Sequence, residues 1–345
     1  MKKVAVVILN WNGRKLLEEF LPSVVQFTNK QIADIVVVDN DSTDDSVRYI
    51  SVNYPEISII RLEENYGYAE GYNKALAQLE HKYYVLLNSD VEVTPHWLDP
   101  LFVFLEEHKD IAAVQPKILA QQNKSFFEYA GASGGFIDKL GYPFCRGRIF
   151  DKVEQDLGQY DTPIEIFWAT GACLFIRSSD YHSVGGLDAS FFAHMEEIDL
   201  CWRLNARGRK LMCLPQSTVY HVGGATLQEE SPQKTFLNFR NNLLMLYKNM
   251  VDTDFRKIYK YRRLLDYAAA LQFLLSGRSK NAKAILKAHR EFKRTRSNYT
   301  AIRDINIKRT TDFSLKTIYP KSILSSFYLK KIKSFSDLKW TQNNS

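Results

Sequence analysis

Apolar and polar positions follow one another in blocks along the first part of the chain. Short, continuous apolar runs rich in β-branched residues are typical of strands covered on both faces, as in parallel sheets. The predicted strands are residues 4–9, 35–38, 57–62 and 83–87, separated by helical spacing at residues 15–27 and 69–79. Strands that alternate with helices through short connections predict right-handed βαβ units, and therefore an α/β fold with a mostly parallel central sheet.

Polar residues follow each of these predicted strands. They are Asn10 and Asn12, Asp39 and Asp41, Asn65 and Gly67, and Asn88, Ser89 and Asp90. Because open α/β sheets bind ligands at the carboxyl ends of their strands, we expect these residues to form one pocket. Helix capping would explain residues 43–46, and a polar turn would explain residues 88–90, without any ligand. No glycine-rich phosphate loop follows any strand, so bound phosphates would need a metal ion, for which Asp90 is the best candidate carboxylate.

The pattern becomes less regular after residue 93. A helix is predicted to start at Thr94 and Pro95, and strands are predicted at residues 91–93, 111–118, 167–176, 210–214 and 218–220. Residues 120–165 are rich in Gly, Phe and Tyr and are predicted to be irregular, either for acceptor recognition or as a floppy insertion. Thr170, Gly171 and Ala172 would let a ligand approach the backbone closely.

The strongest functional signal in the second half is residues 194–203, which are predicted to form a helix. Glu196 and Glu197 start it, and two adjacent carboxylates repel, which raises a pKa toward that of a working base. An ordinary acidic helix start is the alternative. Asp199 and Arg203, one turn apart, can pair. His221 suits a divalent ion, although a lone histidine is more often structural.

Charge divides the chain into two parts. Residues 1–230 hold 21 basic and 32 acidic residues, net −11, whereas residues 231–345 hold 25 and 7, net +18. A polybasic segment is attracted to nucleic acid or to acidic lipid. The four scattered cysteines favour a reducing compartment and argue against a zinc cluster. No apolar run is long enough for a signal-peptide core or a membrane span, so we expect neither.

The basic part is predicted to be largely helical. Residues 236–247 are amphipathic, and residues 282–293 carry an apolar stripe with basic flanks, the pattern of a helix lying on a membrane surface. Packing of these helices on the rest of the protein is the alternative. Residues 300–345 show little pattern, and we predict disorder in the last few. The expected units are 1–230, with halves 1–93 and 94–230, then 231–300 and the tail 301–345.

Taken in order, these motifs resemble those of the family 2 glycosyltransferases, over about residues 3–250. The resemblance is closest to the rhamnosyltransferase-like branch of bacterial surface polysaccharide synthesis. The matching segments are residues 7–13, 37–44, 64–73, 87–90, 170–172, 185–188 and 196–203, and His221 with residues 223–224. The resemblance implies the GT-A fold, inversion at the anomeric carbon, and a nucleotide-sugar donor carrying dTDP, UDP or GDP. It also implies a glycan or lipid-linked acceptor at the inner face of the cytoplasmic membrane.

The resemblance also implies residue roles. Asp39 and Asp41 would hold the base and ribose, and Asp90, with His221, would bind Mg²⁺ or Mn²⁺. Glu197 would be the catalytic base, with Glu196 close behind. The remaining expected nucleotide contacts are Asn10, Asn12, Asn65, Gly67, Asn73, Asn88 and Ser89, and the expected sugar-pocket residues are Thr170, Gly171, Ala172, Asp199 and Arg203. Two positions depart from the family pattern, since Asn88 replaces the first acid of its Asp-X-Asp element and Glu196-Glu197 replaces Glu-Asp.

Two other functions compete with this one. A sugar nucleotidyltransferase shares the sheet plan, but it would carry a glycine- and arginine-rich loop after the first strand, which residues 10–13 do not supply. A basic nucleic-acid-binding protein would use the second half of the chain. Against it, the acidic first half would repel phosphate, and no nucleic-acid-binding motif occurs, so we expect no nucleic-acid partner.

Overall fold

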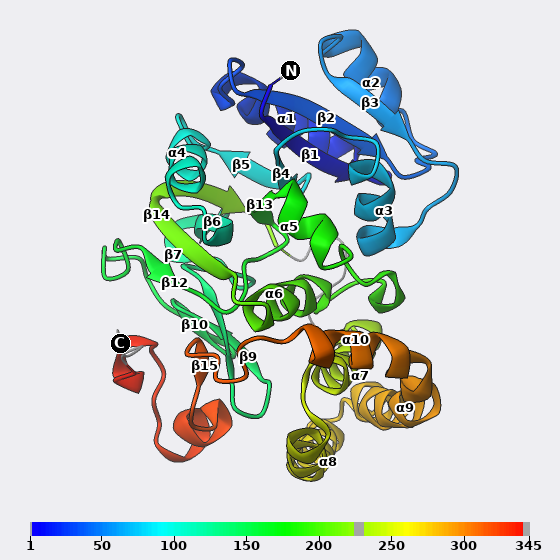
Figure 1. Ribbon diagram of the computed structural model, residues 1–345, viewed down its shortest axis with the longest axis vertical. Coiled ribbons are helices and arrows are strands. Elements are labelled where there is room, and N and C mark those ends of the chain that lie inside the picture. Colours follow the sequence, from blue (N-terminus) through cyan, green and yellow to red (C-terminus); the bar gives the residue numbers. More distant parts are fainter. Residues whose placement is uncertain (1, 224–230, 341–345) are drawn as a thin grey trace.

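The strands predicted from the apolar runs all belong to the largest sheet. The computed structural model describes residues 2–223 and 231–340, and within these residues ten strands form one sheet (Figure 1). Its main path runs β12-β14-β6-β13-β4-β1-β2-β3, with β5 beside β14 and β7 beside β6. The strands are β1 (Val4–Asn10), β2 (Ala33–Asp39), β3 (Ser58–Arg61), β4 (Tyr83–Leu87), β5 (Val91–Val93), β6 (Ile111–Ala120), β7 (Asn123–Phe127), β12 (Ile164–Glu165), β13 (Cys173–Arg177) and β14 (Lys210–His221).

The sheet is parallel in its N-terminal part and mixed beyond it. Strands β4, β1, β2 and β3 are parallel, as predicted, but β13 is antiparallel to both of its neighbours. One face packs against helices α1 (Arg14–Phe27), α2 (Ser46–Asn53) and α4 (Asp99–Glu107). The other packs against α3 (Gly67–Leu76), α5 (Ser178–Ser183) and α6 (Glu196–Ala206). Two covered faces explain why these strands are continuous apolar runs.

Two predictions for the middle of the chain were wrong. Residues 120–165 are not irregular: after β7 they supply four strands of a second sheet, whose fifth strand comes from the tail. These strands are β8 (Gly135–Asp138), β9 (Pro143–Cys145), β10 (Arg148–Ile149), β11 (Lys152–Val153) and β15 (Ile318–Tyr319). The predicted strand 167–176 begins only at Cys173, and residues 167–172 form a buried loop instead. Strands of two to four residues are too short to show periodicity.

Smaller boundary shifts have local causes. The helix predicted from Thr94 begins at Asp99, because residues 94–98 form turns. The two short strands predicted at 210–214 and 218–220 are one strand, β14, whose register shifts between Leu214 and Thr218. A β-bulge of this kind interrupts the alternation of apolar residues without ending the strand.

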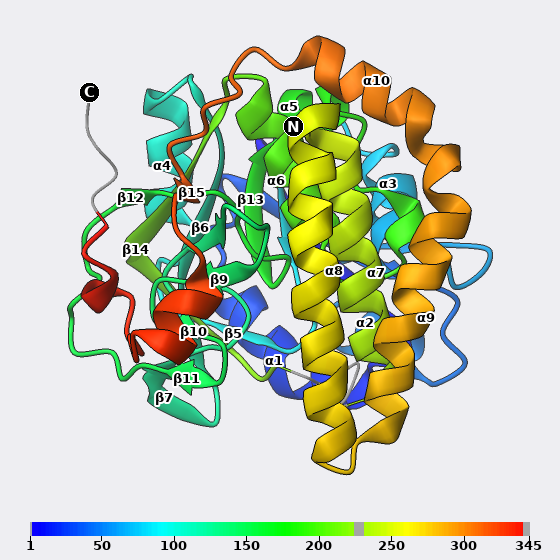
Figure 2. The ribbon, with the colours of Figure 1, turned by 90° about the horizontal axis from the view of Figure 1, so that it is seen from below.

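Four helices form the basic part: α7 (Pro232–Asn249), α8 (Asp252–Leu275), α9 (Ser279–Thr295) and α10 (Thr300–Arg309). The predicted apolar stripe of α9 is buried, since Ile285 and Phe292 are fully covered and α9 packs on α7 and α8 (Figure 2). The membrane-surface interpretation of residues 282–293 is therefore wrong, and packing on the protein is right. None of the described helices is both long and apolar enough to cross a membrane.

The described part of the tail packs on the second sheet. Strand β15 pairs with β8, and Phe335 and Trp340 pack their rings against Phe136 in the second sheet. The predicted disorder concerns residues 341–345, which lie outside the described residues. The predicted boundary at residue 230 also falls in an undescribed stretch, residues 224–230.

A buried ionic network fixes α7 on α6. Lys248 of α7 is 1% exposed and lies between Asp188 and Asp199. Asp199 also accepts hydrogen bonds from Arg203 at 2.9 Å and from Asn249 at 2.8 Å. Burial by itself would raise the pKa of Asp199, but Lys248 and Arg203 outweigh it and hold that pKa below its ordinary value. The network thus keeps Asp199 charged inside the protein.

We expect Lys248→Met to destabilise the protein by about 3 kcal/mol, because removing one partner of a buried ion pair leaves its charges unpaired. Urea unfolding checks this. The control is Lys82→Met, which breaks an exposed pair with Glu106 and should cost less than about 1 kcal/mol. Equal losses in the two variants would contradict the assigned role of Lys248.

Candidate active site

The ends of β1 and β2 lie side by side, and asparagines shape the loop that follows. Asn10 and Asp39 are partners in the register of the two strands. The buried Asn10 amide donates to the Ser46 hydroxyl at 3.0 Å, and its Oδ1 has no hydrogen-bond partner among the described residues. Asn12, in a left-handed conformation, accepts a 2.7 Å bond from the Thr43 backbone N–H. Asn10 Oδ1 is thus a buried acceptor that faces Gly13, where a Cβ would lie 2.3 Å from it.

The end of β2 is tied to the turn before α3 by Asn40, which the sequence analysis did not single out. Its Nδ2 donates to Asn65 Oδ1 at 2.9 Å and to the Gly67 carbonyl at 3.1 Å. Asp39 is 7% exposed, whereas Asp41 is exposed and left-handed. The predicted nucleotide residues of β2 and of this turn are thus brought together. The sequence signal for Asn40 was its place between two aspartates at a strand end.

Asn73 fixes a turn through both ends of its amide group. Its Oδ1 accepts from the Tyr181 hydroxyl at 2.7 Å and from the Leu187 N–H at 3.1 Å, and its Nδ2 donates to the Leu187 carbonyl at 2.8 Å. A Cβ on Gly186 would lie 2.4 Å from that Oδ1. The amide therefore clamps the turn at residues 185–187 to α3, and the role of Asn73 in the nucleotide pocket stays a prediction.

Asp90 and His221 lie together beyond the end of β4. Strands β5 and β14 pair Val91 with His221, which brings the imidazole beside Asp90, with 3.2 Å between Nε2 and Oδ1. Glu128, missed by the sequence analysis, lies 3.4 Å from His221 Nδ1. Burial lowers the pKa of His221, but the carboxylates of Asp90 and Glu128 outweigh it and raise that pKa to about 10. Nothing in the sequence pointed to Glu128. This residue follows β7, whereas His221 ends β14, and only the folding of the sheet brings the two together.

The donor set at this place fits a divalent ion. A carboxylate and a neutral imidazole suit such ions, so binding requires His221 to release the proton that Asp90 and Glu128 stabilise on it. Glu128, at Nδ1, is in the position of the usual outer partner of a metal-bound histidine. No group of three or more His, Cys, Asp and Glu side chains is arranged to hold a metal within residues 2–223 and 231–340. Two protein ligands are nevertheless enough where phosphate oxygens and water complete the coordination, as is common for Mg²⁺.

The loop at residues 170–172 lies between this end of the site and α6. The Asn88 N–H donates to the Ala172 carbonyl at 3.0 Å, and the Tyr68 hydroxyl donates to the Gly171 carbonyl at 2.9 Å. A Cβ on Gly171 would lie 2.4 Å from the Tyr68 hydroxyl. The glycine does permit a close approach to the backbone, as predicted, but the group that approaches is Tyr68 of α3.

Glu196 and Glu197 begin α6 at a buried position. Each has one carboxylate oxygen, Oε2, that is buried and lacks a hydrogen-bond partner among the described residues. Burial raises the pKa of Glu197 to about 7. Burial and the neighbouring Glu197 charge together raise the pKa of Glu196 well above its ordinary value. Both charges also raise the pKa of Tyr68, after burial and Tyr72. The loop reaches α6 through the residue before it, since the Ala169 N–H donates to Cys201 Sγ at 3.5 Å.

A strained turn delivers the two glutamates. Phe192, His194 and Met195 all have positive φ angles, between 65° and 74°, which cost free energy for residues other than glycine. Asn241 of α7, fully buried, donates from its Nδ2 to the carbonyls of residues 191, 193 and 194 at 2.8–3.0 Å. Arg240 donates to the residue 191 carbonyl as well. Helix α7 therefore holds the turn in place.

Asp199 and Arg203 are paired, as the sequence predicted, but they do not face a pocket. Asp199 is fully buried, and both of its oxygens are used by Arg203, Lys248 and Asn249. Arg203 also donates to the Val184 carbonyl. These side chains support α6 from behind, and their assignment to the sugar pocket stays a prediction. Thr170, also predicted there, is buried, and its hydroxyl accepts from the Ala172 N–H.

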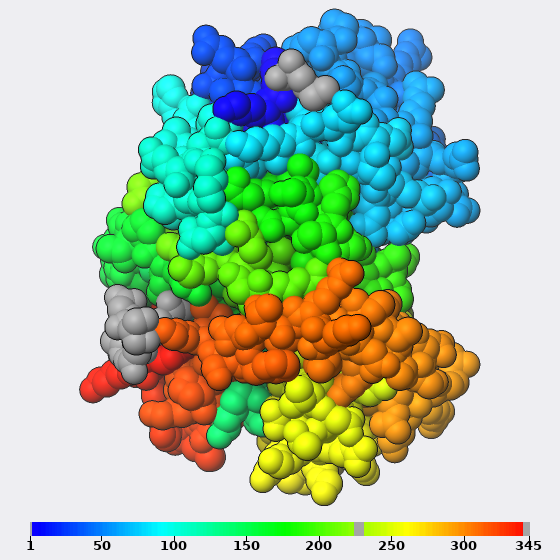
Figure 3. Space-filling view, viewed as in Figure 1, coloured from blue at the N-terminus to red at the C-terminus, as the bar shows by residue number. Residues whose placement is uncertain are grey.

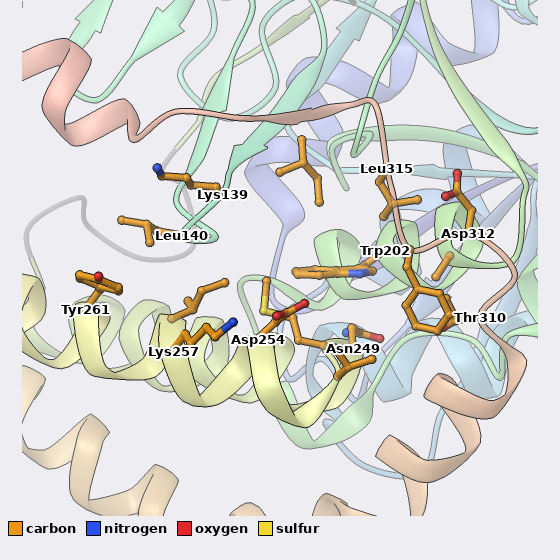
Figure 4. Close-up of a pocket in the computed structure, with 16 residues that line it drawn as sticks. Lys139, Leu140, Trp202, Asn249, Asp254, Lys257, Tyr261, Thr310, Asp312 and Leu315 are labelled. Carbon is orange, nitrogen blue, oxygen red and sulfur yellow. The ribbon is translucent and has the colours of Figure 1, made fainter.

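A separate cavity of about 570 Å³ lies on the far side of α6. Its wall includes Trp202 and Ala206 of α6, Ile258 and Tyr261 of α8, and Phe313 (Figure 4). None of the predicted site residues lines it. Because the candidate chemistry is on the other side of α6, this mostly apolar cavity is not the active site.

Comparison with known proteins agrees with this geometry. The family described as Glycosyl transferase family 2 matches residues 5–182. The N-acetylglucosaminyl-diphospho-decaprenol L-rhamnosyltransferase of Mycobacterium tuberculosis is 26% identical over 233 residues, covering 63% of this chain and 75% of the relative.

Two solved structures share the fold. Staphylococcus aureus TarS 1–349 in complex with UDP-GlcNAc has a TM-score of 0.54 and 16% identity, covering 90% of this chain and 89% of TarS. The mannosyltransferase PcManGT from Pyrobaculum calidifontis, in complex with GDP-Man and Mn²⁺, has a TM-score of 0.52 and 14% identity, covering 89% and 85%. At these identities the likeness shows a GT-A fold.

We expect Asn241→Ala to lower kcat by about 10²-fold with little change in donor KM, because a misplaced catalytic group costs rate rather than binding. Steady-state kinetics measures the split between the two constants. The control is Asn238→Ala, a half-buried position on the same helix. A change in donor KM alone would contradict the positioning role of Asn241.

The pKa of Glu197 predicts a pH-dependent stability. That pKa is about 7 in the folded protein and 4.5 ordinarily, so the folded state binds more protons between these values and loses stability as the pH rises through this window. We expect Glu197→Gln to melt above the native protein at about pH 8 and close to it at about pH 5. Thermal melts test this against the exposed-site control Glu63→Gln. If the difference in melting temperature between Glu197→Gln and the native protein does not change with pH, Glu197 does not titrate in this range in the folded protein.

Proposed function

The chain belongs to glycosyl transferase family 2, and on that premise we propose that it is a metal-dependent, inverting enzyme of cell-surface polysaccharide assembly. It transfers a sugar from a dTDP-, UDP- or GDP-sugar to a hydroxyl group of a glycan or lipid-linked glycan. The rhamnosyltransferase relative supports the acceptor class. The complexes of TarS with UDP-GlcNAc and of PcManGT with GDP-Man support a nucleotide-sugar donor.

The observation that carries this proposal is that the loop at residues 170–172 lies between Asp90 and the Glu196–Glu197 pair. The loop at residues 170–172 is bonded at Ala172 to Asn88, two residues before Asp90. Just before the loop, the Ala169 N–H donates to the sulfur of Cys201, four residues after Glu197 on α6. A donor diphosphate held near Asp90 would therefore place its sugar toward Glu196 and Glu197. This is the order of groups that transfer to an incoming hydroxyl requires.

Glu197 is the proposed base. Its carboxylate takes the proton of the acceptor hydroxyl while that oxygen forms a bond to the anomeric carbon. The bond from this carbon to the diphosphate oxygen breaks, and the nucleoside diphosphate leaves with the electron pair. Attack opposite the leaving group inverts the anomeric configuration. A pKa of about 7 suits a base at neutral pH, and Glu197 is less buried than Glu196, which supports choosing Glu197.

Asp90 and His221 would hold Mg²⁺ or Mn²⁺. Such an ion supplies positive charge that offsets the charge developing on the leaving diphosphate. On the protein side, Glu128 orients His221, and the main chain of Asn88 anchors the strand end that carries Asp90. The complex of PcManGT with GDP-Man and Mn²⁺ supports this assignment. We further propose that the protein works at the inner face of the cytoplasmic membrane, as a peripheral protein.

The test is a panel of dTDP-, UDP- and GDP-sugars, with Mn²⁺ or Mg²⁺, measured by calorimetry and by release of the nucleotide. One donor should bind with metal, and Asp90→Ala should lose that binding, while the exposed-site control Asp151→Ala keeps it. Glu197→Gln should bind the donor but turn over at least about 10²-fold more slowly. Binding of no donor with either metal would overturn the proposal.

A further inference from the structure

Helix α8 carries an unusual apolar face. Six large apolar side chains, spaced mostly three and four residues apart, lie on its outer side: Tyr261, Leu264, Tyr267, Leu271, Leu274 and Leu275, which are 37–81% exposed. They are a third of the eighteen large apolar side chains exposed in the described residues. A gathering of this kind marks an interaction surface rather than a scatter of single residues. We call these six side chains the α8 face.

The charge around the α8 face identifies its partner. Between residues 255 and 290 the only acidic residue is Asp266, and it is buried and bonded to Arg262 and His289. Exposed basic residues flank the face, namely Lys257, Lys260 and Arg263 on α8, and Lys280 and Lys283 on α9. Arg256 is also exposed, but it pairs with Asp252 at the start of α8. A second copy of the chain would bring these charges against one another. An anionic lipid surface complements both the charge and the apolar stripe.

The position of α8 suits such a partner. The helix lies at one end of the molecule, and the half that contains β1–β3 lies at the other (Figures 1 and 3). Seen from below, α8 is the foremost element, with α7 and α9 beside it (Figure 2). Tyr261 belongs both to the α8 face and to the wall of the 570 Å³ cavity (Figure 4). An apolar space thus borders the face.

We propose that α8 docks the protein on an anionic membrane, with the α8 face at the level of the lipid headgroups and the basic residues against their phosphates. This deepens the proposed function, on which it rests for the lipid-linked acceptor, and it replaces α9 by α8 as the membrane contact. Docking in this orientation leaves the β1–β3 half directed away from the lipid, where a water-soluble donor has access.

The test compares two triple variants of the full chain with equal change of charge. Leu271→Glu/Leu274→Glu/Leu275→Glu alters the α8 face, and Val52→Glu/Leu157→Glu/Leu329→Glu alters positions that are 71–79% exposed elsewhere. Binding is measured by co-sedimentation with vesicles of phosphatidylcholine, with and without phosphatidylglycerol. The native chain should bind the vesicles that contain phosphatidylglycerol. The α8 variant should bind at least about tenfold more weakly, and the control should bind as the native chain does.

Three results would overturn the proposal. One is a native chain that does not bind these vesicles, and another is an equal loss in the two variants. The third is a native dimer in sedimentation velocity that only the α8 variant converts to monomer, which would make the face a contact between copies. Donor turnover is measured separately, without vesicles. Vesicle binding that depends on α8 in a chain that binds no donor would overturn the proposed function and leave the docking surface standing.

Discussion

Two carboxyl groups lie next to each other at the buried start of α6, and much of the surrounding structure keeps them there. Burial disfavours the charged form of each, and their proximity adds repulsion. The left-handed turn before them adds a conformational cost of its own. Asn241 offsets this cost through three carbonyl groups, and Lys248 fixes the same helix to α6. Helix α7, which by charge belongs to the basic part of the chain, is therefore a structural part of the site.

The remaining site residues form a connected frame in which amide groups determine the shape. Asn10, Asn12 and Asn40 bond loops to one another at the strand ends, and Asn73 fixes the turn at residues 185–187. An amide both donates and accepts, so one side chain can satisfy two segments at once. Many polar residues at the strand ends are thus required by the fold, although the buried Oδ1 of Asn10 has no partner among the described residues.

The two ends of the molecule have opposite electrostatic character. The half that contains β1–β3 carries the carboxylates and amides of the proposed donor site, and the helical end carries the exposed basic residues and the α8 face. An acidic half is not attracted to an anionic surface, whereas a basic half is. The same distribution of charge that would orient the protein on lipid also keeps its donor site in water. The same charge distribution would therefore explain both the orientation of the protein on lipid and the access of the donor to its proposed site.

The sequence alone determined the strands of the N-terminal half, the polar residues at their ends, the Glu196–Glu197 pair and the family. These are local features, because a strand covered on both faces requires a continuous apolar run. Only the tertiary structure decided which amides bond loops to one another, that Glu128 lies behind His221, and that α8 rather than α9 has the exposed stripe. Both helices are partly amphipathic, and an apolar stripe in the sequence does not show whether the protein itself or another surface covers it. The short strands of residues 120–165 were likewise decided by pairing between distant segments, which leaves no periodic signal in the sequence.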